Sequence, residues 1–247
     1  MKWILFVTIA SLIVPTKRAL HMFQQNRYET TRYTMWLQDF FKTNKKSIIT
    51  ALLTFIVAFI LGVFVNSFIS GLVILLYSVI LVEKEISKDY IKPLVTTARV
   101  MRQIAVTVIL YALLLVVIYK LGFNAMMYLM LLSPFVPYAM IYLMHLITNP
   151  IEALFRKMFK NSAKSILKSN KDLITIGITG SYDKTSSKNI LNEVLSEQFY
   201  TLPTPASFNT PMGITITIRE QLKSTHEAFI VEMGADKVGD IVELSEF

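Results

Sequence analysis

A lysine and a threonine stand side by side where the chain changes from one kind of pattern to another. Lys184 and Thr185 follow an apolar stretch, 172–179, and a short loop that contains glycine. A lysine ammonium in such a place can bind phosphate oxygens, and the hydroxyl that follows can bind Mg²⁺. Glu232, at the end of a second apolar stretch (227–232), adds a carboxylate, which Mg²⁺ also prefers. These residue types together indicate a site for a nucleotide and its metal.

The elements that would position these side chains follow in an order typical of nucleotide-binding domains. Both apolar stretches are short and rich in β-branched residues, like strands buried in a parallel sheet. We expect a strand over 172–179, a helix from Lys184 to about Phe199, an irregular segment over 201–210, a helix over 211–222, a strand over 227–232 and a helical start at 238. This order predicts an α/β P-loop domain, in which the N–H groups of the loop face the phosphates.

The loop departs from a phosphate-binding loop at the residue before its lysine. The predicted nucleotide-binding residues are Gly180, Ser181, Tyr182, Asp183, Lys184, Thr185 and Ser186. A glycine is expected where Asp183 stands, because the backbone must approach the phosphates closely or adopt an angle that favours glycine. Two negative charges about 4 Å apart also repel by roughly 4 kcal/mol at an effective dielectric of 20. We therefore expect this loop to bind ATP poorly.

Three stretches of this region, "ITGSYDKTSSKN", "TPASFNTPMGITITIRE" and "VEMGADKVGDI", resemble the Mur ligase family. Residues 179–186 match the family's loop, T-G-x-x-G-K-T-[ST], except at Asp183. The resemblance covers about residues 172–247. It implies ATP and Mg²⁺ as cofactors, with Thr185 and Glu232 as metal ligands.

The resemblance also implies a reaction, the ATP-dependent formation of an amide bond. Members of the family phosphorylate a carboxylate of a muramoyl-peptide precursor, and an amine such as that of D-alanyl-D-alanine then displaces the phosphate. Asn209 and Thr210 would approach the muramoyl-peptide. The alternative for these two residues and Pro211 is the N-cap of the helix that follows.

The end of the resembling region at Phe247 leads to a further expectation. The resemblance implies a larger sheet and a later amine-binding domain, so we expect a truncated and inactive form of the ligase. Two or three strands leave an open edge and a small core. The alternative is a non-enzymatic membrane remnant or scaffold. A transporter is disfavoured, because the predicted membrane spans carry no acidic residue.

The first half of the chain has the composition of a membrane domain. Of the 247 residues 53% are hydrophobic and 17% charged, and the apolar residues concentrate before residue 150. The apolar run 47–82 would make a helix roughly 54 Å long, against a hydrocarbon core of about 30 Å. We expect it to turn back at Asn66-Ser67, and the last span to kink at Pro134 and Pro137. Five spans are predicted, over 3–14, 47–65, 68–82, 103–120 and 125–148.

Basic residues predict the orientation of these spans. With the N-terminus outside a bacterial cytoplasmic membrane, the loops 15–46 and 83–102 and the C-terminal domain lie in the cytoplasm, and only Lys2 and Lys120 lie outside. The cytoplasmic basic residues are Lys17, Arg18, Arg27, Arg32, Lys42, Lys45, Lys46, Lys84, Lys88, Lys92, Arg99 and Arg102. The net charge of +8 therefore indicates membrane lipid as a partner, and not nucleic acid.

The predicted domains are a multi-span membrane domain (1–148), a connector (149–171) and the start of the ATP-binding domain (172–247). Asn149-Pro150 is expected to close the last span. The helix 151–168 is basic and amphipathic, so it suits either the anionic inner leaflet or packing on the next domain. The absence of cysteine excludes disulfides and thiolate metal sites, and His21, His145 and His226 lack metal-ligand spacing.

Overall fold

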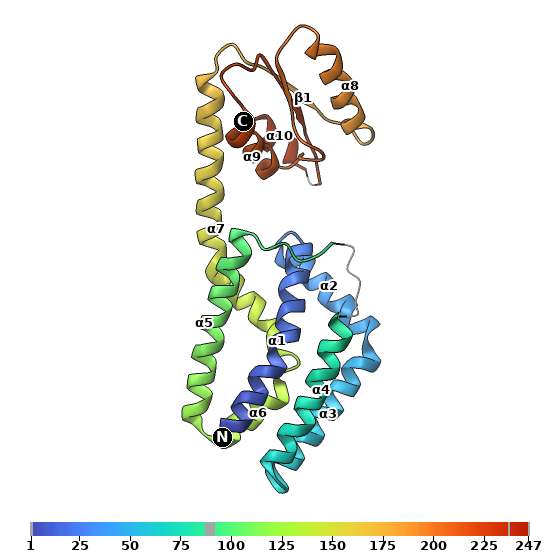
Figure 1. Cartoon of the computed structure of the whole chain (residues 1–247), viewed down its shortest axis with the longest axis vertical. Helices are drawn as coiled ribbons and strands as arrows, with labels where there is room; N and C mark the ends of the chain where they lie inside the picture. Colours follow the sequence, from blue (N-terminus) through green and yellow to red (C-terminus); the bar gives the residue numbers. More distant parts are fainter. Residues whose placement is uncertain (1, 87–91, 237, 247) are drawn as a thin grey trace. The chain divides into compact units, whose positions relative to one another are not determined.

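The computed structural model describes residues 2–86, 92–236 and 238–246 of the chain (Figure 1). These residues form two compact units, Met1–Pro150 and Ile151–Phe247, which are considered separately here. Lys88 of the predicted cytoplasmic loop and Lys237 of the third motif lie outside the described residues. The elements are α1 (Lys2–Gln25), α2 (Thr30–Thr43), α3 (Lys45–Phe64), α4 (Ser67–Ile86), α5 (Ala98–Leu121), α6 (Phe123–Leu132), α7 (Val136–Ser169), β1 (Ile174–Ile178), α8 (Lys184–Ser196), β2 (Thr201–Pro203), α9 (Pro211–Gln221), β3 (Ala228–Glu232) and α10 (Asp240–Ser245).

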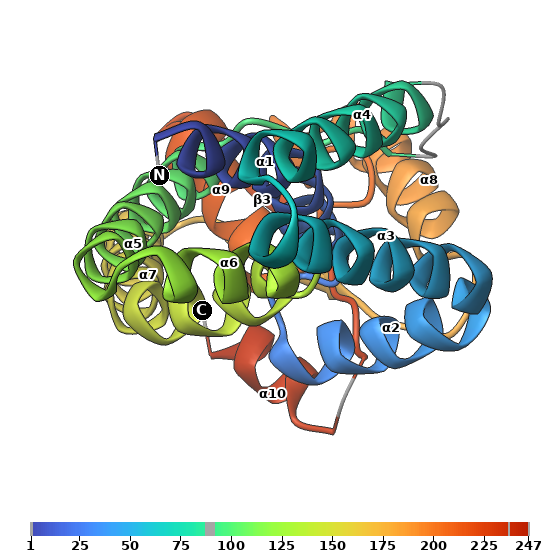
Figure 2. The ribbon, with the colours of Figure 1, turned by 90° about the horizontal axis from the view of Figure 1, so that it is seen from below.

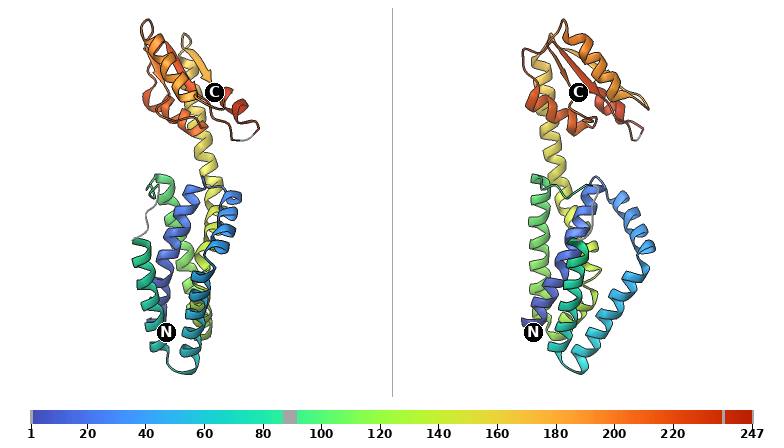
Figure 3. Two further views of the ribbon diagram at one scale, coloured as in Figure 1. Left: turned by 90° about the vertical axis from the view of Figure 1, so that its right-hand side faces the viewer. Right: turned by 45° about the vertical axis from the view of Figure 1, so that its right-hand side comes forward.

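The first unit is a bundle of apolar helices. The predicted turn at Asn66-Ser67 is confirmed: α3 and α4 run side by side as a hairpin, and Asn66 Oδ1 accepts a hydrogen bond from the Phe68 amide at 2.7 Å (Figures 1 and 3). In the part of the chain that the structure describes, α1, α3, α4 and α5 are long and apolar enough to cross a membrane, and the pair α6–α7 adds a fifth if it counts as one span.

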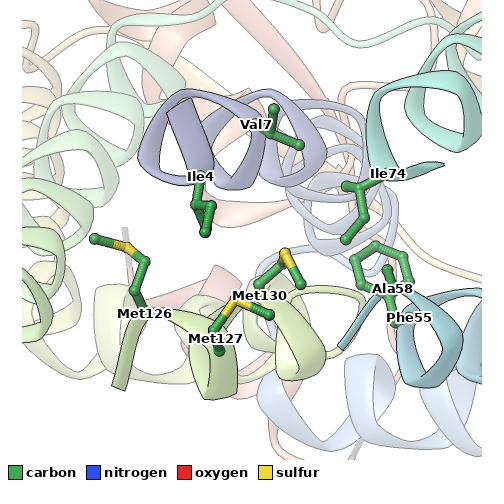
Figure 4. Close-up of a cluster of buried hydrophobic side chains, with 8 residues drawn as sticks. All are labelled: Ile4, Val7, Phe55, Ala58, Ile74, Met126, Met127 and Met130. Carbon is green, nitrogen blue, oxygen red and sulfur yellow. The ribbon is translucent and has the colours of Figure 1, made fainter. Parts of the chain in front are cut away.

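Helix α1 lies between α4 and α5 in the bundle (Figures 1 and 2). Near its beginning, Ile4 and Val7 point towards three methionines of α6 and towards residues of α3 and α4 (Figure 4). This cluster consists of Ile4, Val7, Phe55, Ala58, Ile74, Met126, Met127 and Met130. A second, more aromatic cluster surrounds the other end of α1 and includes Phe23, Tyr33, Tyr138 and Met144. Unbranched methionine fills irregular gaps between helices, which suits a bundle whose axes are not parallel.

Several predicted boundaries in this unit are wrong. The first span does not end at residue 14, because α1 continues through Pro15 to Gln25, and the expected loop 15–46 contains α2. The predicted kink at Pro134 is confirmed as a 92° bend between α6 and α7. Pro150 does not end its helix, which continues to Ser169. The proline removes one backbone hydrogen bond, but buried side chains on both sides of it, such as Met144 and Ala163, stabilise the helix.

The second unit is a three-stranded parallel sheet between helices. The strand order is β1-β3-β2, so β3 is central, and all five of its residues are buried. Helix α8 covers one face, and α9, α10 and the end of α7 cover the other (Figure 3). The segment 201–210, expected to be irregular, contains the short strand β2, and the helix from Lys184 ends at Ser196 instead of Phe199. The expected small parallel sheet is present.

The end of α7 packs on this sheet. This agrees with one of the two interpretations of the helix 151–168, packing on the next domain. Ala163 is fully buried against the sheet, and Lys160 forms an ion pair with Glu243 of α10 at 3.1 Å. The Arg219 guanidinium lies 4.3 Å from the centroid of the Phe159 ring. These contacts position the second half of α7 within its unit. Binding of this helix to the inner leaflet stays a prediction.

A single glycine permits the contact between α1 and α4. A Cβ atom added at Gly71 would lie 2.1 Å from Nε1 of Trp3, and the Trp3 ring stacks on Phe68 with centroids 5.2 Å apart. We predict that Gly71→Ala lowers the free energy of unfolding of this unit by about 1–3 kcal/mol, because the rigid indole must move. Thermal unfolding in detergent, together with Trp3 fluorescence, measures the effect. The matched control is Leu72→Ala, which truncates a side chain exposed on the same helix; equal losses would contradict the prediction.

Candidate nucleotide and metal site

The site lies where two neighbouring strands end. In the register of the sheet, Ile178 of β1 pairs with Glu232 of β3, so the loop 179–183 begins beside the Glu232 carboxylate. Helix α8 begins at Lys184, directly after the loop, as predicted. Ligands of open α/β sheets bind at the carboxyl ends of the strands. The topology therefore brings together the lysine, the threonine and the carboxylate that the sequence analysis selected.

Glu232 is the centre of a hydrogen-bonded network. Its side chain is 2% exposed, and its Oε2 accepts hydrogen bonds from the Thr185 hydroxyl at 2.9 Å and from Lys188 Nζ at 3.2 Å. Its Oε1 accepts one from Asn209 Nδ2 at 3.3 Å, and its backbone N–H donates to the Thr204 hydroxyl at 3.1 Å. A buried carboxylate is tolerated only with such partners. One side chain thus joins β3 to α8 and to the segment before α9.

The partners of Glu232 keep it ionised. Burial by itself raises the pKa of the Glu232 carboxyl, but hydrogen bonds from Thr185 and Lys188, the positive charge of Lys188 and the hydrogen bond from Asn209 lower it below its usual value. Glu232 is therefore a carboxylate at neutral pH, which is the form that a metal ion binds.

Lys188 is the member of the network that the sequence analysis missed. It lies on α8 one turn after Thr185, is 1% exposed, and also donates a short hydrogen bond to the carbonyl of Ala206. Ala206 has a φ of 42°, in the left-handed region. The sequence feature that could have pointed to Lys188 is its spacing of three residues from Thr185, because residues at i and i+3 share one helix face. The spacing places Lys188 on the face of α8 that carries Thr185, and the structure shows that Glu232 is its partner.

The two predicted substrate residues have different surroundings. The Thr210 hydroxyl accepts a hydrogen bond from the Gly213 amide at 3.2 Å and caps α9, with Pro211 at the first position of the helix. Asn209 turns instead to Glu232. The close approach of Gly234 permits this, since a Cβ there would lie 2.9 Å from Cγ of Asn209. The N-cap alternative thus describes Thr210, and Asn209 is the one that lies within the site.

The loop before α8 adopts a backbone conformation that favours glycine, at a position where this chain has Asp183. Asp183 has φ 54° and ψ 20°, a left-handed conformation, and its side chain is exposed without capping α8. Lys184 turns back and donates to the carbonyl of Gly180 at 2.6 Å. Ser181, Tyr182 and Ser186 are exposed, Tyr182 to 90%. A carboxylate at the amino end of α8 stands where the helix dipole would favour a phosphate, so this loop does not fit a polyanion well.

The metal ligands, in contrast, fit magnesium. Oγ1 of Thr185 and Oε2 of Glu232 are 2.9 Å apart, which is about the separation of adjacent ligands in an octahedral Mg²⁺ shell with bonds of about 2.0–2.1 Å. Both are oxygen donors, and Mg²⁺ keeps waters and phosphate oxygens as its remaining ligands. Among the described residues no group of three or more His, Cys, Asp or Glu could hold a metal.

Comparison with known proteins identifies the source of this arrangement. Residues 178–247 match the model of the Mur ligase middle domain. This segment is similar to the middle domain of the Mur ligase family. The resemblance found in the three sequence motifs is thereby confirmed.

Several UDP-N-acetylmuramoyl-tripeptide–D-alanyl-D-alanine ligases are similar to this part of the chain. The enzyme of Treponema pallidum is 34% identical over 74 residues, which are 30% of this chain and 16% of the relative. That of Bacillus subtilis is 36% identical over 70 residues, 28% of this chain and 15% of the relative. That of Buchnera aphidicola is 31% identical over 114 residues, 46% of this chain and 22% of the relative. The chain thus spans less than a quarter of these relatives. No solved structure matches it significantly.

The buried pair of Lys188 and Glu232 generates a prediction about stability. Lys188→Met leaves the Glu232 carboxylate buried without its counter-charge, and we expect a loss of about 3–5 kcal/mol in the second unit. Hydrogen exchange of the β3 amides in the full chain measures this loss. The double variant Lys188→Met/Glu232→Gln removes the uncompensated charge and should recover part of the protection. Equal exchange in the single and double variants would contradict the ion-pair interpretation.

Proposed function

We propose that this chain carries the ATP-binding start of a membrane-attached amide ligase of the Mur family. The substrates of that ligase are a muramoyl-peptide carboxylate and an amine such as that of D-alanyl-D-alanine. The observation that carries the proposal is the contact of Thr185 with Glu232 at the carboxyl ends of β1 and β3. In the proposal these two oxygens are the ligand pair for Mg²⁺, and they lie close to Lys184 at the amino end of α8.

In this proposal each residue has a limited task. Lys184 binds phosphate oxygens, Thr185 and Glu232 hold Mg²⁺, and Asn209 orients Glu232 and faces the muramoyl-peptide. Bound ATP would supply the phosphoryl group that activates a carboxylate. Lys188 is a positioning residue, because it acts on the metal through Glu232. In this proposal the chain with aspartate at position 183 binds ATP poorly and is inactive, because the Asp183 carboxylate adds a negative charge to the phosphate-binding loop.

The effect of Asp183 is directly testable. We predict that Asp183→Gly increases the affinity for a fluorescent ATP analogue with Mg²⁺ by at least about tenfold, since even half of the expected repulsion corresponds to more than that factor. The dissociation constant is measured by fluorescence titration of the full chain in detergent.

Two controls accompany this titration. Tyr182→Gly adds a glycine one residue earlier in the loop, at an exposed position, and should change the affinity less than twofold. Adding Lys184→Ala to the Asp183→Gly chain should abolish the gain. A glycine form that binds no better than the original chain would count against a nucleotide site.

A second candidate function is favoured by one observation, the left-handed Asp183 with its carboxylate at the start of α8. A loop of this kind suits a non-enzymatic scaffold whose task lies in the membrane half. The scaffold hypothesis predicts no nucleotide binding even with Gly at position 183, and a membrane phenotype that survives deletion of residues 172–247. The same titration therefore separates the two candidates.

The proposed orientation places the N-terminus outside and the second unit in the cytoplasm of a bacterial cytoplasmic membrane. The chain has no cysteine, so single cysteines can report on it without background. We predict that a membrane-impermeant maleimide labels Lys120→Cys in intact cells, but labels Lys42→Cys only after permeabilisation. The opposite pattern would reverse the orientation, and labelling of both in intact cells would contradict a spanning bundle.

A further inference from the structure

A groove runs between α1 and α5 in the first unit. Its volume is about 480 Å³, within the range of ligand sites in proteins. Residues of α1 such as Ile9, Leu12 and Ile13 line one wall, and residues of α5 such as Ile104 and Val108 line the other. Ile9, Ile13 and Val108 are exposed, so the groove is open at its side. A molecule could therefore enter laterally from the surroundings of the bundle.

The interior of the groove suits hydrocarbon. Its lining is almost wholly apolar, and the hydroxyl groups in it are already paired within the protein. The hydroxyls of Thr16 and Tyr111 are hydrogen-bonded to each other at 2.8 Å, and the Thr107 hydroxyl donates to the carbonyl of Gln103 at 2.8 Å. A polar ligand would find few partners here and would lose its hydration.

The length of the groove matches one leaflet of a membrane. The lining residues of α1 extend from Ile9 to Leu20, which is roughly 17 Å at 1.5 Å per residue. This is about half of the hydrocarbon thickness of about 30 Å. A chain that fills the groove from one membrane surface would end near the bilayer midplane.

One end of the groove carries charge and a backbone strap. Among the lining residues that the structure describes, Lys17 alone is charged, and it lies at the end that the basic loops place in the cytoplasm. Residues 92–95 cross this end: the Gln24 side chain exchanges two hydrogen bonds with the Val95 backbone, at 2.8 and 3.0 Å. Leu94 of this strap lines the groove. The charged end is therefore held in place by hydrogen bonds to α1.

We propose that the groove between α1 and α5 binds one acyl chain of an anionic glycerophospholipid of the inner leaflet, with the phosphate of its headgroup at Lys17. The part of the lipid inside the groove is an acyl chain, because the lining is apolar. The headgroup is anionic, because Lys17 lies at the end of the groove. Its chain comes from one leaflet because the groove is one leaflet deep. The inference rests on the membrane orientation proposed above, and it is independent of nucleotide binding.

Native mass spectrometry of the full chain in detergent tests this proposal. We expect one phosphatidylglycerol to stay bound, with a preference of roughly fivefold or more over phosphatidylcholine of the same chain length, as one lysine near an anionic surface confers. Lys17→Gln should remove this preference, and Lys42→Gln, an exposed lysine outside the groove, should keep it. Equal binding of the two lipids by the original chain would overturn the assignment of the headgroup.

A second pair of variants tests the groove itself. Ala112→Trp fills the groove from α5 and should abolish lipid binding, while Leu113→Trp, at an exposed position that does not line it, should have no effect. Both variants can be checked for folding by the thermal transition of the bundle. Equal lipid retention in the two variants, or none in the original chain, would overturn the proposal. Displacement of phosphatidylglycerol by an equal concentration of a polyprenyl phosphate would show that the occupant is wrong. If the proposed membrane orientation is wrong, the maleimide labelling reveals this independently of the lipid experiments.

Discussion

The second unit depends on one buried carboxylate. The Glu232 carboxylate would cost several kcal/mol alone in the interior, and three side chains from two other segments make its burial possible. Each partner is fixed in turn: Thr185 and Lys188 by the first two turns of α8, Asn209 by the close approach of Gly234. The order of the loop, the helix and the segment before α9 thus follows from the need to satisfy a single charge.

The first unit follows a different rule, since its core contains few polar contacts and its outer faces are apolar. Small residues permit close approach of helices, as Gly71 does for Trp3, and methionines fill the remaining gaps. Polar groups of the spans bond mostly within their own helix, as Thr8 and Ser78 do with the carbonyls one turn before them. If the bundle lies in a membrane, as proposed, its helices associate through the fit of their surfaces, because lipid gives them no hydrophobic reason to prefer each other.

The structural features that depend on local sequence patterns were predicted correctly. The two β-branched runs form β1 and β3, and the polar pair Asn66-Ser67 forms a turn. Both were predictable because the spacing of apolar residues, and the polar residues that interrupt it, are local properties of the sequence. What depends on tertiary contacts was missed. The three residues of β2 are too few to show alternation, and Pro150 continues its helix because side chains on both sides are buried. The partner of Lys188 could not be predicted from the sequence, because only the position of β3 shows which carboxylate faces this lysine.

The aspartate in the phosphate loop has a consequence for the fate of the chain in a cell. Aspartate tolerates the left-handed conformation better than most residues other than glycine, and its charge is favourable at a helix N-terminus. Aspartate at this position is therefore compatible with a folded loop and helix. Chaperones and proteases act on unfolded protein, so a residue that weakens phosphate binding in a folded loop would not by itself expose the chain to them. The amount of folded chain in a cell and its affinity for a nucleotide can therefore change independently of each other.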